Sequence, residues 1–223
     1  MKRNLSAFAL IALALAAGPG EARKRQVKDA TNPSALIAAE IAFNRMAQEK
    51  GQWTAFRKFA AEDAVMFAPQ PVNGQQWLKG RPDPAQSLQW QPHRVWSSCD
   101  GEYGITWGAW QNAGKQGWFS TVWRRDDKGT LKWVLDQGGD MAAAPPAPEM
   151  IEAKIASCSN KTAIEPALVP VPPPGTQVLL SESRDKTLRW VTRVESNGSR
   201  YYALEYWNGS TFERPVARPV PAP

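Results

Sequence analysis

The stretch FAAEDAVMFAP, residues 59–69, decides the fold, because a helical pattern ends within it and a strand begins. Asn32 followed by Pro33 predicts an earlier helix start, since asparagine caps a free backbone amide and proline is tolerated at the first helical position. The apolar residues that follow recur at spacings of three and four, which predicts one buried helical face. A second, short helix is expected to end near Asp63, and Ala64–Phe67 is expected to form a strand.

The region after this strand alternates between apolar and polar residues in long runs. Turn residues such as Asp100-Gly101 separate the runs, which is typical of antiparallel strands joined by tight turns. Helices followed by such strands predict an α+β layer structure. Four strands are expected, at roughly 88–98, 103–111, 117–125 and 130–137.

This order of elements resembles the nuclear transport factor 2-like, or SnoaL-like, superfamily. The resemblance covers about half of the chain, and its strand phrases are similar to those of an exported branch of unassigned function. It implies a cone, in which N-terminal helices pack on a curved antiparallel sheet, with a pocket at its mouth. It also implies a homodimer through the open face of the sheet. The phrases that carry it are Glu62–Val65, Val72–Gly74, Tyr103–Gly108 and Thr121–Arg125.

The positions of the superfamily's steroid-isomerase residues hold other residues in this chain. The resemblance places the aspartate base at Ala68, the oxyanion tyrosine near Phe43 or Asn44, and the protonated aspartate near Thr121. The base and both donors to a developing enolate are therefore missing. We expect a non-catalytic module that takes a small apolar ligand or a protein partner in the cone or on the sheet face. The alternative is a lyase or isomerase of the ketosteroid isomerase or polyketide cyclase type with non-standard pocket residues.

Three other titratable residues are weak candidates for acid–base work: Glu40, His93 and Asp136. A buried carboxylate near a histidine would have a shifted pKa and would act as a base on an apolar substrate. The alternative is structural. It places Glu40 at the edge of the helix face, Asp136 in turn contacts and His93 in solvent.

Tryptophan is concentrated in the predicted cone, where nine of the 11 lie between Trp53 and Trp133. Tryptophans can line a pocket for a flat or apolar ligand, because each combines a large apolar area with one donor. They can equally fill a small curved sheet, or mark a dimer surface where they are exposed. Strand alternation selects four lining candidates, Trp90, Trp107, Trp118 and Trp123.

The amino end predicts export. Lys2 and Arg3 precede an apolar run over residues 5–17, and Gly20 and Ala22 offer a small-residue cleavage site. The run is shorter than the roughly 20 residues that a membrane-spanning helix needs, so an uncleaved anchor is the minor alternative. We expect a periplasmic protein without a membrane span after cleavage of residues 1–22.

Two cysteines remain in this exported chain, Cys99 and Cys158. In an oxidising compartment their pairing would stabilise the fold by roughly 4 kcal/mol on the chain-entropy model. Two buried free thiols are the alternative. His93 is the only histidine, which argues against a zinc site built from cysteine and histidine. The sequence contains no glycine-rich phosphate loop, and we expect no metal and no cofactor.

The formal net charge is +6, of which +5 belongs to the chain after residue 22. A basic arm ahead of the first helix supplies much of it, through Arg23, Lys24, Arg25 and Lys28. Such an arm is usually solvated, and export argues against a nucleic-acid partner. Weak attraction to an anionic membrane surface is the alternative.

Composition divides the chain into five parts. Residues 1–22 are the signal peptide and 23–140 the nuclear transport factor 2-like domain. Residues 141–175 are an Ala/Pro-rich linker, because proline favours extended segments without a core. Residues 176–213 alternate as a small β unit, and 214–223 are expected to be a disordered tail.

The linker and the small β unit carry two further expectations. Residues 150–156 are expected to form a helical turn or two. A β unit of this size buries little surface alone, so it should pack against the cone or a partner. A third alternative is a structural role at the cell envelope, with the proline-rich segments as spacers. A chain that ends at Asp140 should then lose its function and keep a folded cone.

Overall fold

The computed structural model describes residues 32–166 and 171–222, so the predicted signal peptide and basic arm lie outside the described residues. Helix α2 spans Pro33–Lys50, and the Asn32 side chain accepts a hydrogen bond from Ser34 N, as the sequence predicts. Helix α3 spans Gln52–Phe59. It ends before Asp63, the predicted boundary, because the chain pairs as a strand with the sheet from Ala60 onward.

Gly51 separates the two helices and has φ +104°, a conformation that L side chains rarely adopt. A Cβ at this position would lie 2.3 Å from the carboxyl carbon of Asp83. That carboxylate accepts hydrogen bonds from Thr54 N at 2.9 Å and Thr54 Oγ1 at 2.6 Å. The Asp83 carboxylate therefore accepts a hydrogen bond from a free backbone N–H at the start of α3, which an N-cap side chain at residue 51 would otherwise do.

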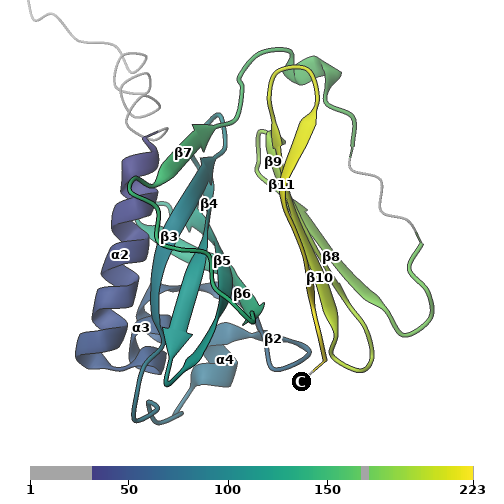
Figure 1. Cartoon of the computed structure of the whole chain (residues 1–223). Coiled ribbons are helices and arrows are strands. Elements are labelled where there is room, and N and C mark those ends of the chain that lie inside the picture. The colour runs from purple at the N-terminus through teal and green to yellow at the C-terminus, as the bar shows by residue number, and fades with distance from the viewer. Residues whose placement is uncertain (1–31, 167–170, 223) are drawn as a thin grey trace, which may run out of the picture.

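The first sheet has seven strands in the order β2-β1-β6-β5-β4-β3-β7. The helices cover one of its faces (Figure 1), which confirms the α+β class. The short helix α4, Gly74–Leu78, follows β2. The strands are β1 (Ala60–Phe67), β2 (Pro71–Asn73), β3 (Gln89–Ser97), β4 (Tyr103–Asn112), β5 (Lys115–Arg125), β6 (Leu131–Asp140) and β7 (Glu152–Ile155).

Two pairings in this sheet differ from the sequence prediction. β1 runs parallel to β6, and β7 runs parallel to β3, so the sheet is mixed rather than antiparallel. β7 also replaces the helical turns predicted for residues 150–156. The physical reason is that β7 pairs with the backbone of β3 along Arg94–Ser97. Local periodicity does not reveal such a long-range pairing.

A second, antiparallel sheet follows in the order β11-β10-β9-β8. A short 3-10 turn at Lys161–Ala163 lies between the two sheets in the chain. The strands are β8 (Gln177–Glu182), β9 (Leu188–Val194), β10 (Arg200–Trp207) and β11 (Phe212–Val220).

The prediction of a disordered tail over residues 214–223 is wrong for residues 214–220, which belong to strand β11. It pairs with β10 from Phe212 to Val220 and buries Val216 and Val220. Pro215 and Pro219 are tolerated because β11 is an edge strand, where a missing N–H costs no ladder hydrogen bond.

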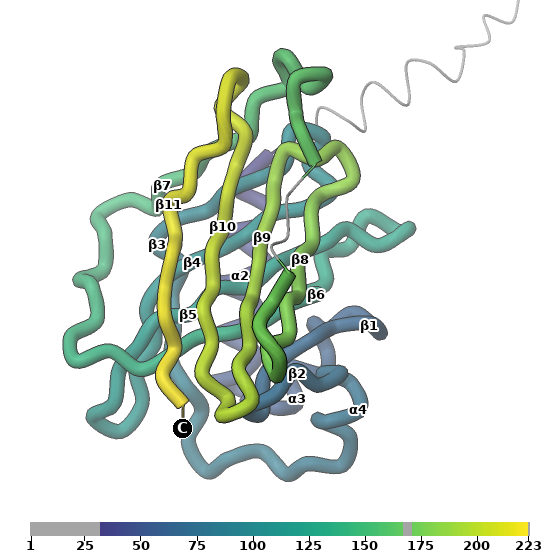
Figure 2. The backbone as a smooth tube through the Cα atoms, turned by 90° about the vertical axis from the view of Figure 1, so that its right-hand side faces the viewer, coloured from purple at the N-terminus to yellow at the C-terminus, as the bar shows by residue number. Residues whose placement is uncertain are grey.

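The second sheet packs on the face of the first sheet that the helices leave open (Figures 1 and 2). The ring of Trp118 stacks on Tyr202 at 6.0 Å between centroids, and the Tyr202 hydroxyl lies 2.9 Å from Ser120 Oγ. Gln137 Nε2 donates to Thr192 Oγ1 at 3.0 Å. The face that the resemblance assigned to a dimer is thus covered by the chain's own C-terminal sheet.

A disulfide joins the turn after β3 to the segment after β7. Cys99 is bonded to Cys158, with the Cα atoms 5.3 Å apart, as predicted. Cys99 N also donates to Thr187 Oγ1 at 3.0 Å, and Ser157 N donates to Trp207 O at 2.8 Å. The bond therefore holds the turn after β3 and the segment after β7 beside the second sheet. Across the described ranges, no helix is long and apolar enough to span a bilayer.

Candidate functional site

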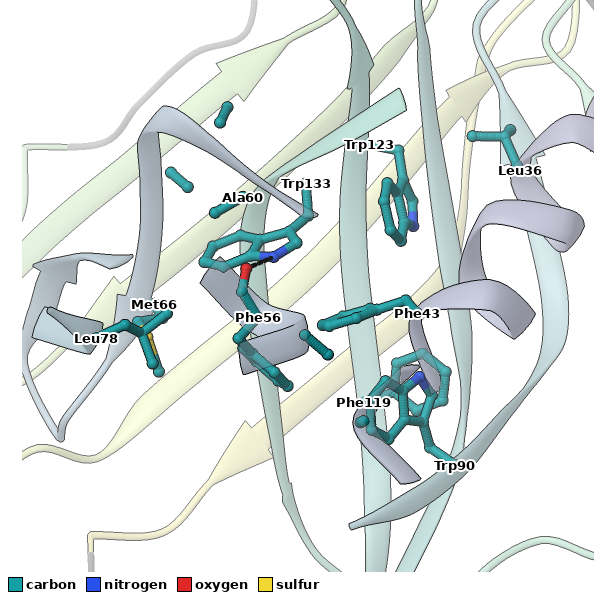
Figure 3. Close-up of a cluster of buried hydrophobic side chains, with 14 of the residues drawn as sticks. Leu36, Phe43, Phe56, Ala60, Met66, Leu78, Trp90, Phe119, Trp123 and Trp133 are labelled. Carbon is teal, nitrogen blue, oxygen red and sulfur yellow. Dashed lines mark hydrogen bonds between the residues drawn. The ribbon is translucent and has the colours of Figure 1, made fainter. Parts of the chain in front are cut away.

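The space between the helices and the first sheet is filled by aromatic rings (Figure 3). Phe43 lies at its centre and contacts Phe56 at 4.7 Å, Trp90 at 4.9 Å and Trp123 at 5.9 Å between ring centroids. The side chains of Trp123 and Trp133 have no exposed surface. The interior that the resemblance assigned to a pocket is a packed core in this protein.

Glu40 is an acidic group within this core. It is fully buried and accepts hydrogen bonds from Trp90 Nε1 at 2.6 Å, Trp123 Nε1 at 2.9 Å and Thr106 Oγ1 at 2.5 Å. Burial raises the pKa of Glu40, and the hydrogen bonds from Thr106, Trp90 and Trp123 oppose this shift.

The burial of Glu40 corrects its predicted place at the edge of the helix face. The buried residues of α2 are Leu36, Glu40, Phe43 and Ala47, which follow one another at spacings of four, three and four. Glu40 therefore lies in the middle of the apolar stripe. From this spacing alone the burial of Glu40 could have been predicted.

Asp136 lies close by on β6 and retains a little exposed surface. It accepts a hydrogen bond from Thr121 Oγ1 at 2.8 Å rather than making turn contacts. Burial is the main cause that raises the pKa of Asp136, to about 8, and the charge of Glu40 raises it further. Thr106 Oγ1 bonds both Glu40 and the backbone oxygen of Thr121. The structure thus brings Glu40 and Asp136 into one hydrogen-bonded network.

His93 lies elsewhere, and it is buried rather than exposed as predicted. It is the extra residue of a β-bulge, because the register between β3 and β4 shifts between Pro92 and Arg94. Its ring meets Trp107 edge-on, 6.0 Å away between centroids. Burial, with a contribution from Arg94, lowers the pKa of His93, so the imidazole is neutral at pH 7.

The four predicted lining tryptophans are divided between the two faces of the first sheet. Trp90 and Trp123 belong to the core beneath the helices. Trp107 and Trp118 lie in the layer between the two sheets. They do not face a common cavity, because the sheet separates the two pairs.

A groove of about 670 Å³ lies on the outer face of the C-terminal sheet. That face of the sheet is turned toward the viewer in Figure 2. Its floor is an apolar row in which Leu180, Val191 and Ala203 lie opposite one another on β8, β9 and β10. Ala163, Glu165 and Pro166 also line the groove. Sequence reasoning missed this groove. Its signal was that β9 and β10 carry apolar residues on both faces, with Val191 directly after the inward-facing Trp190.

Charged residues flank this apolar row. On one side Arg189 pairs with Glu182 at 3.2 Å, and Arg214 pairs with Glu205 at 2.5 Å. On the other side Arg193 lies opposite Tyr201 on β10, and Tyr201 is 37% exposed. Arg193 is itself exposed and forms no ion pair with any residue that the structure describes. The groove thus offers an apolar floor beside one cation that is free to meet an anion.

Comparisons with known proteins give likenesses of fold at low identity. No protein-family model matches the chain. No curated protein matches it either.

Within residues 32–166 and 171–222, no group of three or more His, Cys, Asp or Glu side chains could hold a metal ion.

The solved structures that are similar to the chain include the following three. A protein provisionally assigned as a ketosteroid isomerase, from Parabacteroides distasonis, has 15% identity and a TM-score of 0.38 over 46% of this chain and 85% of its own. A second such protein, from Kribbella flavida, has 12% identity and a TM-score of 0.34 over 62% of this chain and 94% of its own. An NTF-2 like protein of unknown function from Burkholderia xenovorans has 16% identity and a TM-score of 0.32 over 57% of this chain and 91% of its own.

Proposed function

We propose that this protein is an exported, non-catalytic binding module that holds an apolar ligand with an anionic head group on the outer face of its C-terminal sheet. The observation that carries the proposal is the groove of about 670 Å³, in which an apolar floor ends beside the unpaired Arg193. Ligand pockets of small molecules are usually concave, mainly apolar and supplied with a few polar groups, within roughly 300–1,000 Å³. The groove fits that description.

The two surfaces that the sequence favoured for binding are both occupied by the chain itself. Rings fill the cone interior, and the C-terminal sheet covers the open face of the first sheet. The lyase or isomerase alternative requires a substrate beside a titratable group, whereas Glu40 has no exposed surface. A homodimer would likewise have to form through a surface other than the open sheet face.

The disulfide supports the exported location. A bond between Cys99 and Cys158 persists in oxidising compartments and is rare in the reducing cytosol. The periplasmic assignment of the sequence analysis is therefore retained as part of the proposal.

The test is calorimetric titration of the whole protein with three probes of equal chain length: dodecanoate, dodecanol and dodecyltrimethylammonium. We expect dodecanoate to bind most tightly, since Arg193 can pair with its carboxylate. Two variants report on the groove, Arg193→Gln and Val191→Asp. Their matched controls lie on distant surfaces: Arg45→Gln on α2 and Ile155→Asp on β7, where Ile155 is 48% exposed.

We expect Arg193→Gln to remove the preference for dodecanoate over dodecanol, and Val191→Asp to weaken all apolar probes at least tenfold. The control variants should bind as the parent does. Equal binding of all three probes by the parent protein would overturn the proposal, as would unchanged binding in the Val191→Asp variant.

A further inference from the structure

A second groove lies where β3, β4 and β5 meet at one end of the cone. It consists of two adjoining cavities, of about 570 Å³ and about 330 Å³, which share Gln89, Gln111 and Gln116 as lining residues. Eight of its lining side chains are asparagine or glutamine amides. We call it the amide groove. It is separate from the groove on the C-terminal sheet and does not depend on the function proposed for that sheet.

Three glutamines form a row across the floor of the amide groove. Gln89 on β3 lies opposite Gln111 on β4, and Gln111 lies opposite Gln116 on β5. Gln111 Nε2 donates to Gln89 Oε1 at 3.2 Å, and Gln116 Nε2 donates to Ala142 O at 2.9 Å. These bonds fix the side chains. Within the described residues, they leave Gln89 Nε2 as a donor and the Oε1 atoms of Gln111 and Gln116 as acceptors for a ligand.

The groove carries almost no charge. Among the described residues that line either cavity there is no carboxylate, and Lys115 and His93 are the only titratable ones. Burial lowers the pKa of His93, so it is neutral at pH 7. An anionic ligand would therefore meet a single lysine, and a cationic ligand would meet no counter-charge.

A tryptophan and an asparagine also line the amide groove. Trp110, which precedes Gln111 on β4, lines the larger cavity, is half-buried against the core beneath the helices and lies over Gly117, where a Cβ would lie 2.5 Å from the indole. Its Nε1 donates to Trp118 O at 3.1 Å, which holds the ring in place. Asn112 Oδ1 is buried and has no hydrogen-bond partner among the described residues. A buried acceptor without a partner is costly, so a ligand donor at this place would be favourable.

We propose that the amide groove binds a neutral oligosaccharide. Each sugar hydroxyl both donates and accepts, as each amide side chain does, so a row of amides matches a row of hydroxyls without charge. Anions, cations and wholly apolar molecules each lack one part of this match.

The test is titration of the whole protein with chitotetraose, cellotetraose and maltotetraose, followed by calorimetry and by the side-chain amide signals of glutamine in NMR spectra. Tetragalacturonate serves as the anionic comparison. The informative variant is Gln111→Leu, and its control is Gln76→Leu, since Gln76 is exposed on α4 and outside both cavities.

At least one neutral tetrasaccharide should bind and shift the glutamine side-chain signals. Gln111→Leu should weaken that binding at least tenfold while leaving dodecanoate binding on the C-terminal sheet unchanged, and Gln76→Leu should change neither. The proposal is overturned if no neutral tetrasaccharide binds at millimolar concentration, if Gln111→Leu binds as the parent does, or if tetragalacturonate binds more tightly than every neutral probe.

Discussion

The indole nitrogen of Trp123 lies 2.9 Å from a carboxylate oxygen of Glu40, in a core where neither side chain has exposed surface. Trp90 and Thr106 supply two more donors to the same carboxylate. One acidic group on α2 thus joins β3, β4 and β5 through hydrogen bonds. Because a buried charge without partners is costly, the three donors are what make this position tolerable.

Replacing Glu40 with glutamine should destabilise the fold although the side chain keeps its size. Trp90 Nε1 contacts one carboxylate oxygen and Trp123 Nε1 contacts the other. A glutamine amide therefore sets its own N–H groups against an indole N–H in either orientation. A buried donor without an acceptor costs roughly 1–3 kcal/mol. We expect the unfolding free energy in urea at neutral pH to fall by that amount.

The control for this variant is Glu49→Gln, an exposed position on the same helix. It should unfold at the parent's urea concentration. Equal stability of the Glu40→Gln variant and the control would contradict the role given to the three donors.

The sequence predicted α2 and the four strands β3 to β6 well, because their periodicity is local, but it predicted helical turns in place of β7. The sequence-based prediction placed Glu40 at the edge of the helix face, although its spacing matches that of the buried residues of α2. Burial of an acid is expected only where hydrogen-bond donors surround it, and the sequence does not show which residues those are. Those donors lie 50, 66 and 83 residues away in Trp90, Thr106 and Trp123. Only the folded sheet brings them together.

Asp136→Asn should change how stability depends on pH. The folded-state pKa of Asp136 is about 8, whereas an aspartate in an unfolded chain has a pKa of about 3.9. Between these values the folded state binds the extra proton, so Asp136 makes stability fall as pH rises from about 4 to about 8, by at most about 1.4 kcal/mol per pH unit. Asparagine can still accept from Thr121 and has no proton to lose.

The measurement is urea unfolding of parent and variant at about pH 5 and about pH 8.5, on either side of most of this titration. The variant should gain stability relative to the parent at the higher pH. Asp140→Asn, an exposed change at the end of the same strand, should show no such gain. A parent-to-variant difference that does not change with pH would show that Asp136 is ionised in the folded protein.

Removing the disulfide should leave the fold intact but much less stable. The bonded residues Cys99 and Cys158 are 59 residues apart in the chain, and closing a loop of that length contributes roughly 4 kcal/mol on the chain-entropy model. We expect the double variant Cys99→Ala, Cys158→Ala to lose about this amount in urea unfolding. Reductant should lower the stability of the parent and leave that of the variant unchanged.

Thiol labelling provides the independent check on this bond. The parent unfolded without reductant should take up no maleimide, because both cysteines are bonded. Uptake at both cysteines under those conditions would contradict the pairing.

The C-terminal sheet is the part of the fold that local sequence patterns predict least completely. Strand alternation predicted a small β unit over residues 176–213, but the tail from Arg214 to Pro223 was expected to be disordered. Proline is compatible with an edge strand, and β11 is one. Local signals do not say which strand lies at an edge. For the same reason the sequence could not tell whether the tryptophans of the open sheet face meet solvent, a second chain or this sheet.

Ending the chain after Ile164 should make the remaining protein self-associate. This shortened chain keeps β7 and the disulfide but loses the sheet that covers Trp96, Trp107 and Trp118, each less than 9% exposed in the whole protein. An apolar patch that large on a soluble monomer is an association surface. We expect larger species in size-exclusion chromatography with light scattering, together with increased binding of the dye ANS.

A chain that ends after Val220 keeps all four strands and should elute as the whole protein does. If the Ile164 product instead stays monomeric and folded, the C-terminal sheet is a separate unit on a spacer, as the proline-rich composition suggested, and the layer between the sheets contributes little to stability.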